Sequence, residues 1–271
     1  MIRNHDVPLH AIVSVLGILT VAILYFAVFP NLGTDARFWF TAISRTLMLS
    51  MVALAAGLAA HRFGWWSEYV GRAWTLFFVE YTVLTVGEIA RRASPGDSTL
   101  NEICVVIANI AGIGAYVLMA RSLSAAGLAY YGSRAKKIAF MVLALALALA
   151  LCQAPIREAF QSLRTNDPSI GAFVSPLADV ITFVLVAPLL LTTFALRGGQ
   201  LFWMFAFLTT GTVGWMVNQG AGAIVTLAGG GENAVRTGRM IGFAMACFLI
   251  AAAALTQWLA AQRAIRGAQH A

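Results

Sequence analysis

The sequence predicts an all-α bundle that crosses a membrane about eight times, and three observations carry this prediction. Hydrophobic residues make up 60% of the chain and charged residues 11%, whereas about a quarter of the residues of a soluble domain are charged. Several stretches of roughly 20 residues contain at most one charge, and a helix of that length spans the hydrocarbon core. The arginines stand singly or in pairs at the ends of these stretches, where they anchor and orient helices.

The apolar stretches make residues 1–271 a single integral membrane domain, because the connections between them are too short for a soluble domain. The first stretch stays apolar for about 20 residues and lacks a small-x-small cleavage site, so it is predicted to be a helix and not a signal peptide. The expected spans are 8–30, 38–60, 73–90, 102–120, 138–155, 176–196, 201–227 and 240–261.

The fourth and sixth spans begin alike, with the pattern Ser-x-Leu-x-acid. Ser98 and Glu102 open the fourth span, and Ser175 and Asp179 open the sixth. A serine cap with a carboxylate in the first turn suits the positive end of the helix dipole. The sequence therefore predicts two similarly capped helices. Pro188, inside the sixth span, removes one helix hydrogen bond and is expected to kink the helix.

The fifth and seventh spans differ most in composition. The fifth contains the alternation LALALALALAL, which could suggest a barrel strand. Eighteen apolar residues without polar partners do not suit a barrel with a polar lumen, so a helix is expected. Small residues let membrane helices approach closely. The seventh span has four glycines: Gly211, Gly214, Gly220 and Gly222.

Eight spans place both termini on one side of the membrane. That side carries ten of the arginines and lysines outside the spans, among them Lys136 and Lys137, and the other side carries seven. The positive-inside rule then places both termini in the cytoplasm, and we expect a multi-pass protein of a bacterial inner membrane.

Ionisable residues inside membrane spans are costly, so each is a hypothesis of function. At 1.5 Å per residue, Arg45 lies about 10 Å from the outer end of the second span. Most other polar side chains of the spans also fall in the periplasmic half, whereas Glu80 falls in the inner half. The predicted ligand-binding residues are Arg45, Tyr81, Glu88, Asn109, Asp179, Trp215 and Asn218.

Two interpretations of this polar set stay open. In one, Arg45 pairs with Glu88 or Asp179, and the amides hold the bundle in register through hydrogen bonds between helices. Those amides are Asn109, Asn218 and Gln219. In the other, the same side chains line a pocket that opens to the periplasm and takes a small or lipid-like ligand.

Catalysis, cofactors and metals find little support in the sequence. The spans contain no pair of histidines for haem or a metal, and both lysines lie in a loop, where they cannot bind retinal. The three cysteines have neither metal-ligand spacing nor an even number for disulfides. The net charge of +7 sits at helix ends and gives no reason to expect nucleic acid binding. No enzyme activity, cofactor or metal is therefore predicted.

Two segments of the chain carry a resemblance to a known family. They are GRAWTLFFVEYTVLTVGEIARRASPGDSTLNEICVVIANIAGIGAYVLMAR and SPLADVITFVLVAPLLLTTFALRGGQLFWMFAFLTTGTVGWMVNQ. With them the chain resembles the eight-helix membrane modules N-terminal to bacterial sensor histidine kinases and diguanylate cyclases. In such modules an acid closes the third helix, as Glu88 would, and acids open the fourth and sixth, as Glu102 and Asp179 would. Asn218 stands where the seventh helix often has an acid.

The resemblance implies a non-enzymatic sensor of a periplasmic ligand. Only LAAQRAIRGAQHA follows Trp258, so the output domain is expected on a cytoplasmic signalling partner that contacts the end of the eighth span. The first alternative is a small-solute transporter or channel, in which Pro188 and the glycines of the seventh span serve alternating access. The second is an intramembrane lipid enzyme that uses Glu88 or Asp179 as acid or base.

Overall fold

The computed structural model describes residues 9–94, 98–127, 133–162, 170–195 and 200–269. Within these ranges the chain is helical, without a strand, and eight helices are long and apolar enough to cross a membrane. The predicted fold class is thereby confirmed. The first helix, α1 (Leu9–Ile23), continues as a π-helical turn η1 (Leu24–Val28) and a 3-10 turn η2 (Phe29–Asn31). The other helices are α2 (Thr34–Arg62), α3 (Tyr69–Ala93), α4 (Thr99–Ala125), α5 (Arg134–Ser162), α6 (Ile170–Ala195), α7 (Gln200–Leu227) and α8 (Glu232–Gln269).

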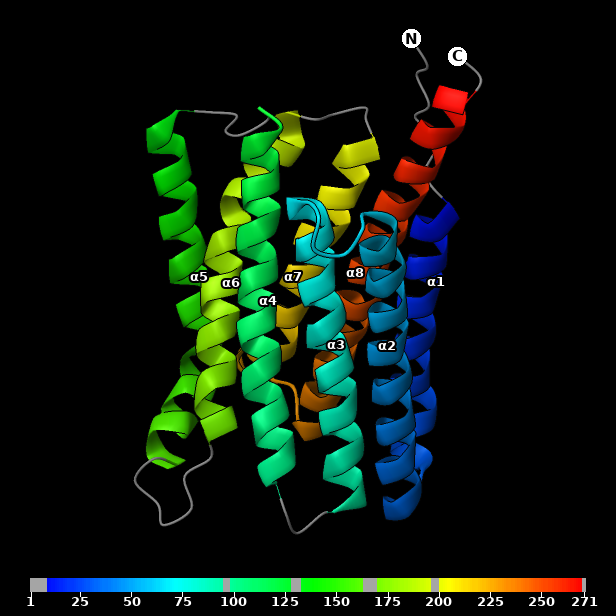
Figure 1. The fold of residues 1–271 in the computed structure, drawn as a ribbon. Helices are drawn as coiled ribbons and strands as arrows, with labels where there is room; N and C mark the ends of the chain where they lie inside the picture. Colours follow the sequence, from blue (N-terminus) through cyan, green and yellow to red (C-terminus); the bar gives the residue numbers. More distant parts are fainter. Residues whose placement is uncertain (1–8, 95–97, 128–132, 163–169, 196–199, 270–271) are drawn as a thin grey trace.

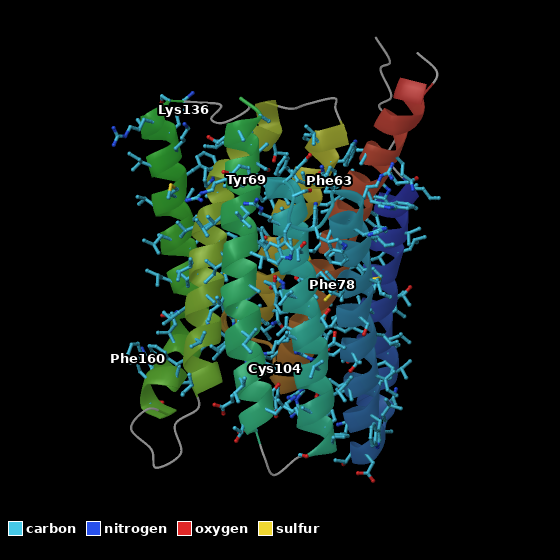
Figure 2. The ribbon with its side chains drawn as sticks, viewed as in Figure 1. Phe63, Tyr69, Phe78, Cys104, Lys136 and Phe160 are labelled. Atoms are coloured by element: carbon cyan, nitrogen blue, oxygen red, sulfur yellow. The ribbon has the colours of Figure 1, made fainter. Side chains whose placement is uncertain are left out.

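The helices run alternately up and down, so α1 begins and α8 ends at the same end of the bundle (Figure 1). We call this the terminal end and the opposite one the distal end. Lys136 lies near the terminal end of α5, and Cys104 lies near the distal end of α4 (Figure 2). The prediction that the terminal end faces the cytoplasm remains untested by the fold.

Six helices form a closed ring in the order α2, α3, α4, α6, α7 and α8, each packed against the next. Outside the ring, α1 packs against α8, and α5 packs against α6 and α7. Since α8 has neighbours on both sides, 78% of its most apolar segment is buried, against 17% for α5. The leucines of the Leu-Ala alternation, such as Leu143 and Leu147, are exposed to lipid, while Ala144 and Ala148 face neighbouring helices. The alternation therefore belongs to a helix, as predicted.

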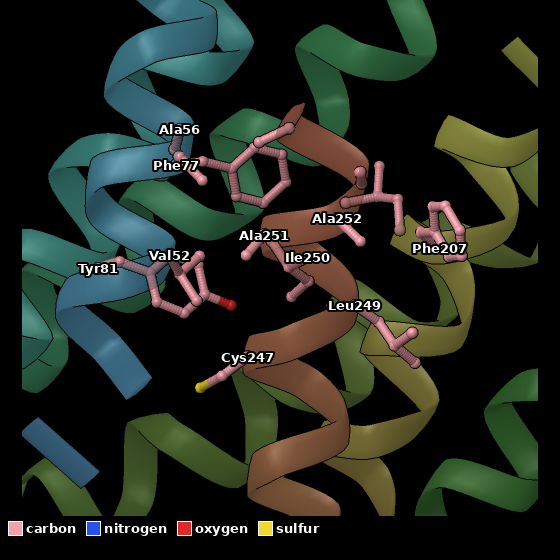
Figure 3. Packing of buried hydrophobic residues seen from close by; sticks show 14 of the residues in the cluster. Val52, Ala56, Phe77, Tyr81, Phe207, Cys247, Leu249, Ile250, Ala251 and Ala252 are labelled. Carbon is pink, nitrogen blue, oxygen red and sulfur yellow. The ribbon is translucent and has the colours of Figure 1, made fainter. Parts of the chain in front are cut away.

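Small residues allow α8 to sit between α2 and α7. Figure 3 shows Val52, Phe77 and Tyr81 of α2 and α3 directed toward α8, where they meet small side chains including Cys247 and Ala251. On the opposite side, glycines of α7 contact α8 so closely that added methyl groups would collide with it. A Cβ atom at Gly214 would lie 2.5 Å from the backbone nitrogen of Ala246. This confirms the packing role predicted for the glycines of this span, with the exception of Gly222, which faces open space.

The helices extend beyond the predicted apolar spans. For example, α6 begins at Ile170 and α8 at Glu232, each several residues before the predicted starts at 176 and 240. Hydropathy marks only the part of a helix that lies in hydrocarbon, whereas the helical backbone continues into the interface.

The predicted serine caps are wrong. Ser175 lies in the second turn of α6, not at its start, because the helix begins at Ile170. Ser98 does stand at the N-cap position of α4, but its hydroxyl donates to the Glu102 carboxylate at 3.2 Å and accepts no capping hydrogen bond from a backbone N–H of the helix. The Glu102 carboxylate also accepts from the backbone N–H of Ile170 at 3.1 Å. Glu102 of α4 therefore caps α6, which joins two helices that are distant in sequence.

Candidate functional site

A polar cavity of 180 Å³ lies inside the ring of helices, lined by residues of α2, α3, α4, α6 and α7. We call it the inner cavity. Its polar or aromatic lining residues are Arg45, Glu80, Asn109, Tyr116, Ser175, Asp179, Thr182, Thr212, Trp215, Asn218 and Gln219. Five predicted ligand-binding residues, Arg45, Asn109, Asp179, Trp215 and Asn218, are among them.

Asp179 lies deep in the bundle, because it is nine residues from the start of α6, or about 14 Å at 1.5 Å per residue. Its Oδ2 atom accepts a hydrogen bond from Gln219 Nε2 of α7 at 2.7 Å, and the same amide lies 3.5 Å from Ser175 Oγ. The predicted hydrogen bond of Gln219 between helices is thereby confirmed. The second oxygen of Asp179 leaves the carboxylate able to accept a further donor from the cavity.

Glu80 lines the cavity, although the predicted ligand-binding set did not include it. It is the twelfth of the 25 residues of α3, so it lies at the middle of the helix and not apart from the polar set. Its Oε2 atom is buried and has no hydrogen-bond partner among the described residues. A Cβ atom at Gly112 would lie 2.9 Å from both carboxylate oxygens, so the missing side chain at Gly112 makes the space for them. A signal was available: Glu80, Leu84 and Glu88 follow one another at four-residue spacing on one helix face.

The hydroxyl and amide groups around the two acids differ in how they are held. Tyr116 Oη and Thr212 Oγ1 form a hydrogen bond of 2.7 Å between α4 and α7. Asn109 Nδ2 donates at 2.8 Å to the carbonyl oxygen of Val105 in its own helix, so the hydrogen bond expected between helices is wrong for this residue. Its amide oxygen remains able to accept a hydrogen bond from a ligand.

The other two predicted site residues, Tyr81 and Glu88, support the walls and do not line the cavity. Trp215 Nε1 donates to the Tyr81 hydroxyl at 3.1 Å, and the indole ring packs edge-on against Phe243 of α8 with centroids 5.4 Å apart. This arrangement connects α3, α7 and α8 beside the cavity.

Glu88 is surrounded by arginines. Its carboxylate accepts from Arg45 at 3.3 Å, which confirms that predicted pair, and also from Arg91 at 2.8 Å and Arg92 at 3.0 Å. Glu88 is only 5% exposed, so removal of its charge would leave several cations close together. The Arg45 guanidinium also lies over the Phe243 ring, 4.3 Å from its centroid.

A second cavity, of 550 Å³, lies between the inner cavity and the distal end. We call it the outer cavity. Arg45 and Asn218 line both cavities, which therefore adjoin at these two residues. The other residues that line the outer cavity are Tyr25, Phe29, Thr34, Arg37, Phe38, Thr41, Arg92, Arg236, Arg239 and Met240. From the sequence, the arginines of the outer cavity were expected to anchor and orient the helices in the membrane. The sequence did not predict that these arginines lie together.

Large apolar side chains are buried on the terminal side of the inner cavity. Trp74 and Phe77 lie on α3 between its terminal end and Glu80, and both are fully buried. Met119 of α4 and Leu208 of α7 are also fully buried at 0% exposure. The inner cavity thus adjoins the outer cavity on one side and large apolar side chains on the other.

Comparison with known proteins finds no family model, no curated protein and no solved structure that matches the chain. Among the described residues, no group of three or more histidine, cysteine, aspartate or glutamate side chains is placed to hold a metal ion. The function must therefore be argued from the two cavities themselves.

Proposed function

We propose that the protein is a multi-pass membrane sensor that binds a small ligand in the inner cavity and signals through α8 to a partner protein. The observation that carries this proposal is the buried carboxylate of Glu80, which lies beside the second acid, Asp179, and whose Oε2 atom has no hydrogen-bond partner among the described residues. A buried polar atom without a hydrogen bond is destabilising, and a ligand that donates to it would remove this cost. Polar groups in the membrane interior are a common mark of ligand sites.

The lining suggests the chemistry of the ligand. Glu80 and Asp179 favour an ammonium or another strong hydrogen-bond donor, while the amides and hydroxyls around them would fix its orientation. The volume of 180 Å³ is below the roughly 300–1,000 Å³ of pockets for drug-sized molecules, so the ligand is small.

The large apolar side chains buried on the terminal side of the inner cavity favour binding over conduction. A solute in the inner cavity could leave toward the terminal end only if Trp74, Phe77 and their neighbours moved apart. Transport therefore remains the second candidate, and it makes a different prediction: a transporter would move the ligand across liposome membranes, whereas a sensor would bind it without flux.

Contacts between the site and α8 suggest how occupancy would be signalled. Phe243 of α8 packs against both Arg45 and Trp215, and Gly242 lies against the backbone of Asn218. A ligand that moves these side chains would move α8, which continues to the terminal end. In the proposed orientation, in a bacterial inner membrane with cytoplasmic termini, the cavities open to the periplasm and α8 meets a cytoplasmic partner beyond Gln257. The resemblance to bacterial sensor modules supports the same assignment.

Thermal unfolding of the purified protein in nanodiscs tests the proposal, with a panel of amino acids, small amines and polyamines as probes. A compound that binds the folded protein raises its melting temperature by mass action. We expect at least one such compound, and we expect its effect to disappear in Glu80→Gln and Asp179→Asn. Glu158→Gln is the matched control, because Glu158 is exposed on α5 away from both cavities. A shift that both cavity variants retain, or a panel without effect, would argue against the inner cavity as the site.

A further inference from the structure

The outer cavity gathers five arginines from three helices at the distal end. Arg37 and Arg45 come from α2, Arg92 from the last turn of α3, and Arg236 and Arg239 from the first turns of α8. Among the described residues, the acids in ion pairs with these five are Glu88, which also binds Arg91, and Glu232, which binds Arg236. Counted over the part of the chain that the structure describes, at least three positive charges of the lining therefore have no acid of their own in an ion pair.

Like charges in one cavity repel each other, and the repulsion is stronger at the edge of a membrane than in bulk water. Membrane proteins can spread arginines over their surface without this cost. Their convergence on one cavity is therefore understandable if the cavity takes an anion that neutralises them.

Three of the guanidinium groups are held in position by aromatic rings. Arg92 lies over the Phe38 ring at 4.4 Å from its centroid, and Arg45 lies over Phe243 at 4.3 Å. Arg37 lies over Phe29 at 5.6 Å, and its Nε donates to the Phe29 carbonyl oxygen at 3.1 Å. Such cation–π contacts orient the side chains before a ligand arrives, which lowers the entropic cost of binding.

One wall of the outer cavity is shaped by the irregular end of the first span. The π-helical turn Leu24–Val28 is followed by a 3-10 turn, and together they contribute Tyr25 and Phe29 to the lining. Tyr25 is anchored there by a hydrogen bond of 3.1 Å between its hydroxyl and Ser44 Oγ. Single π-helical turns occur frequently at functional sites, and here the irregular turn completes a cavity lined by both arginines and aromatic rings.

We propose that the outer cavity is a binding site for a phosphate group that is attached to, or accompanied by, an apolar moiety. The planar guanidinium fork matches phosphate oxygens in a bidentate manner, and several arginines together suit its multiple charge. Arg236 and Arg239, which are exposed at the rim, make the first contacts, and Arg37 and Arg92 complete the cage. The phosphate comes either from the headgroup of an anionic phospholipid or from a soluble phosphate. This site is independent of the ligand proposed for the inner cavity.

The test uses the full chain, purified in a neutral detergent and depleted of lipid. In the first arm, native mass spectrometry compares the binding of phosphatidylglycerol with that of phosphatidylcholine. In the second arm, melting temperatures are compared in sodium phosphate and in sodium chloride of equal ionic strength. Arg239→Gln is measured beside Arg157→Gln, which removes the same charge from an exposed position at the distal end of α5, outside both cavities.

We expect Arg239→Gln to weaken binding of the phosphate probe about tenfold or more, as for loss of one charged hydrogen bond, and Arg157→Gln to leave it unchanged. Preference for phosphatidylglycerol identifies a lipid headgroup as the source, and stabilisation by inorganic phosphate alone identifies a soluble one.

Arg236→Gln is the second variant if Arg239→Gln does not fold. Equal loss in Arg157→Gln, unchanged binding in the rim variants, or no binding of either probe overturns the proposal. Glu80→Gln should bind phosphate normally, which separates this test from that of the inner cavity.

Discussion

The contact between α7 and α8 at Gly242 allows a sharp test of the packing. A Cβ atom at Gly242 would lie 2.4 Å from the backbone nitrogen of Asn218 and 2.8 Å from the carbonyl oxygen of Gly214. Ordinary contacts of a Cβ atom lie at 3.4–4 Å, so Gly242→Ala requires these two helices to separate by about 1 Å. Both obstacles are backbone atoms, so no side chain can rotate away to make room.

The loss of stability expected for Gly242→Ala follows from this geometry. Overpacking typically destabilises by about 1–3 kcal/mol, and a rigid backbone obstacle places Gly242→Ala at the upper end, about 3 kcal/mol. The alanine recovers about 0.5–1 kcal/mol because glycine is unfavourable inside a helix. The expected net loss is about 2 kcal/mol. Gly222→Ala is the matched control: the chemical change is the same, but a Cβ atom there meets nothing within 4 Å, so this variant should be neutral or slightly stabilised.

Equilibrium unfolding in mixed micelles with increasing SDS measures both variants against the parent protein. We expect the free energy of unfolding to differ by about 3 kcal/mol between Gly242→Ala and Gly222→Ala. Since Asn218 lines both cavities, Gly242→Ala should also weaken binding at each of them. Equal stability of the two variants would refute the close contact between α7 and α8 and the position of Asn218 that depends on it.

Two further changes test the polar connections around the cavities. Glu88→Gln leaves Arg45, Arg91 and Arg92 close together without their shared carboxylate, and we expect it to destabilise by about 3 kcal/mol in the same unfolding assay. Glu232→Gln, which breaks an exposed pair with Arg236, should cost less than about 1 kcal/mol, and comparable losses in the two variants would contradict the burial of Glu88. For the hydrogen bond between Trp215 and Tyr81, a double-mutant cycle of Trp215→Phe and Tyr81→Phe should give a coupling energy of about 1 kcal/mol, whereas additive effects would show that the bond contributes nothing.

The polar site illustrates where sequence reasoning succeeded. Arg45 and Glu88 could be paired because a charge inside a span needs a partner, and few charges are available in the spans. Gln219 was recognised for the same reason, as a polar group at a depth where lipid offers no hydrogen bonds. Asp179 was included in the predicted site, but its placement in the first turn of the sixth span was wrong, because α6 begins nine residues earlier, at Ile170. Glu80 was left out of the predicted set because it lies just on the terminal side of the midpoint of its helix, and the polar side chains were sorted by membrane half. Ser175 was misjudged because α6 continues beyond its apolar segment to Ile170, where Glu102 of another helix supplies the cap.

The sequence by itself determined that the chain forms eight membrane-length helices, because the cost of burying backbone in lipid forces each long apolar run into a helix. It could not determine which helices are neighbours. Lipid tails are as apolar as leucine, so hydrophobicity does not sort one membrane helix from another, and packing of small residues decides instead. Only the tertiary structure placed α8 between α2 and α7, brought Arg236 and Arg239 to Arg37 and Arg92, and enclosed Glu80 and Asp179 in one cavity. Each of those encounters joins residues far apart in the chain, and close packing at small residues such as Gly242 and Gly112 is the physical reason that their helices can meet.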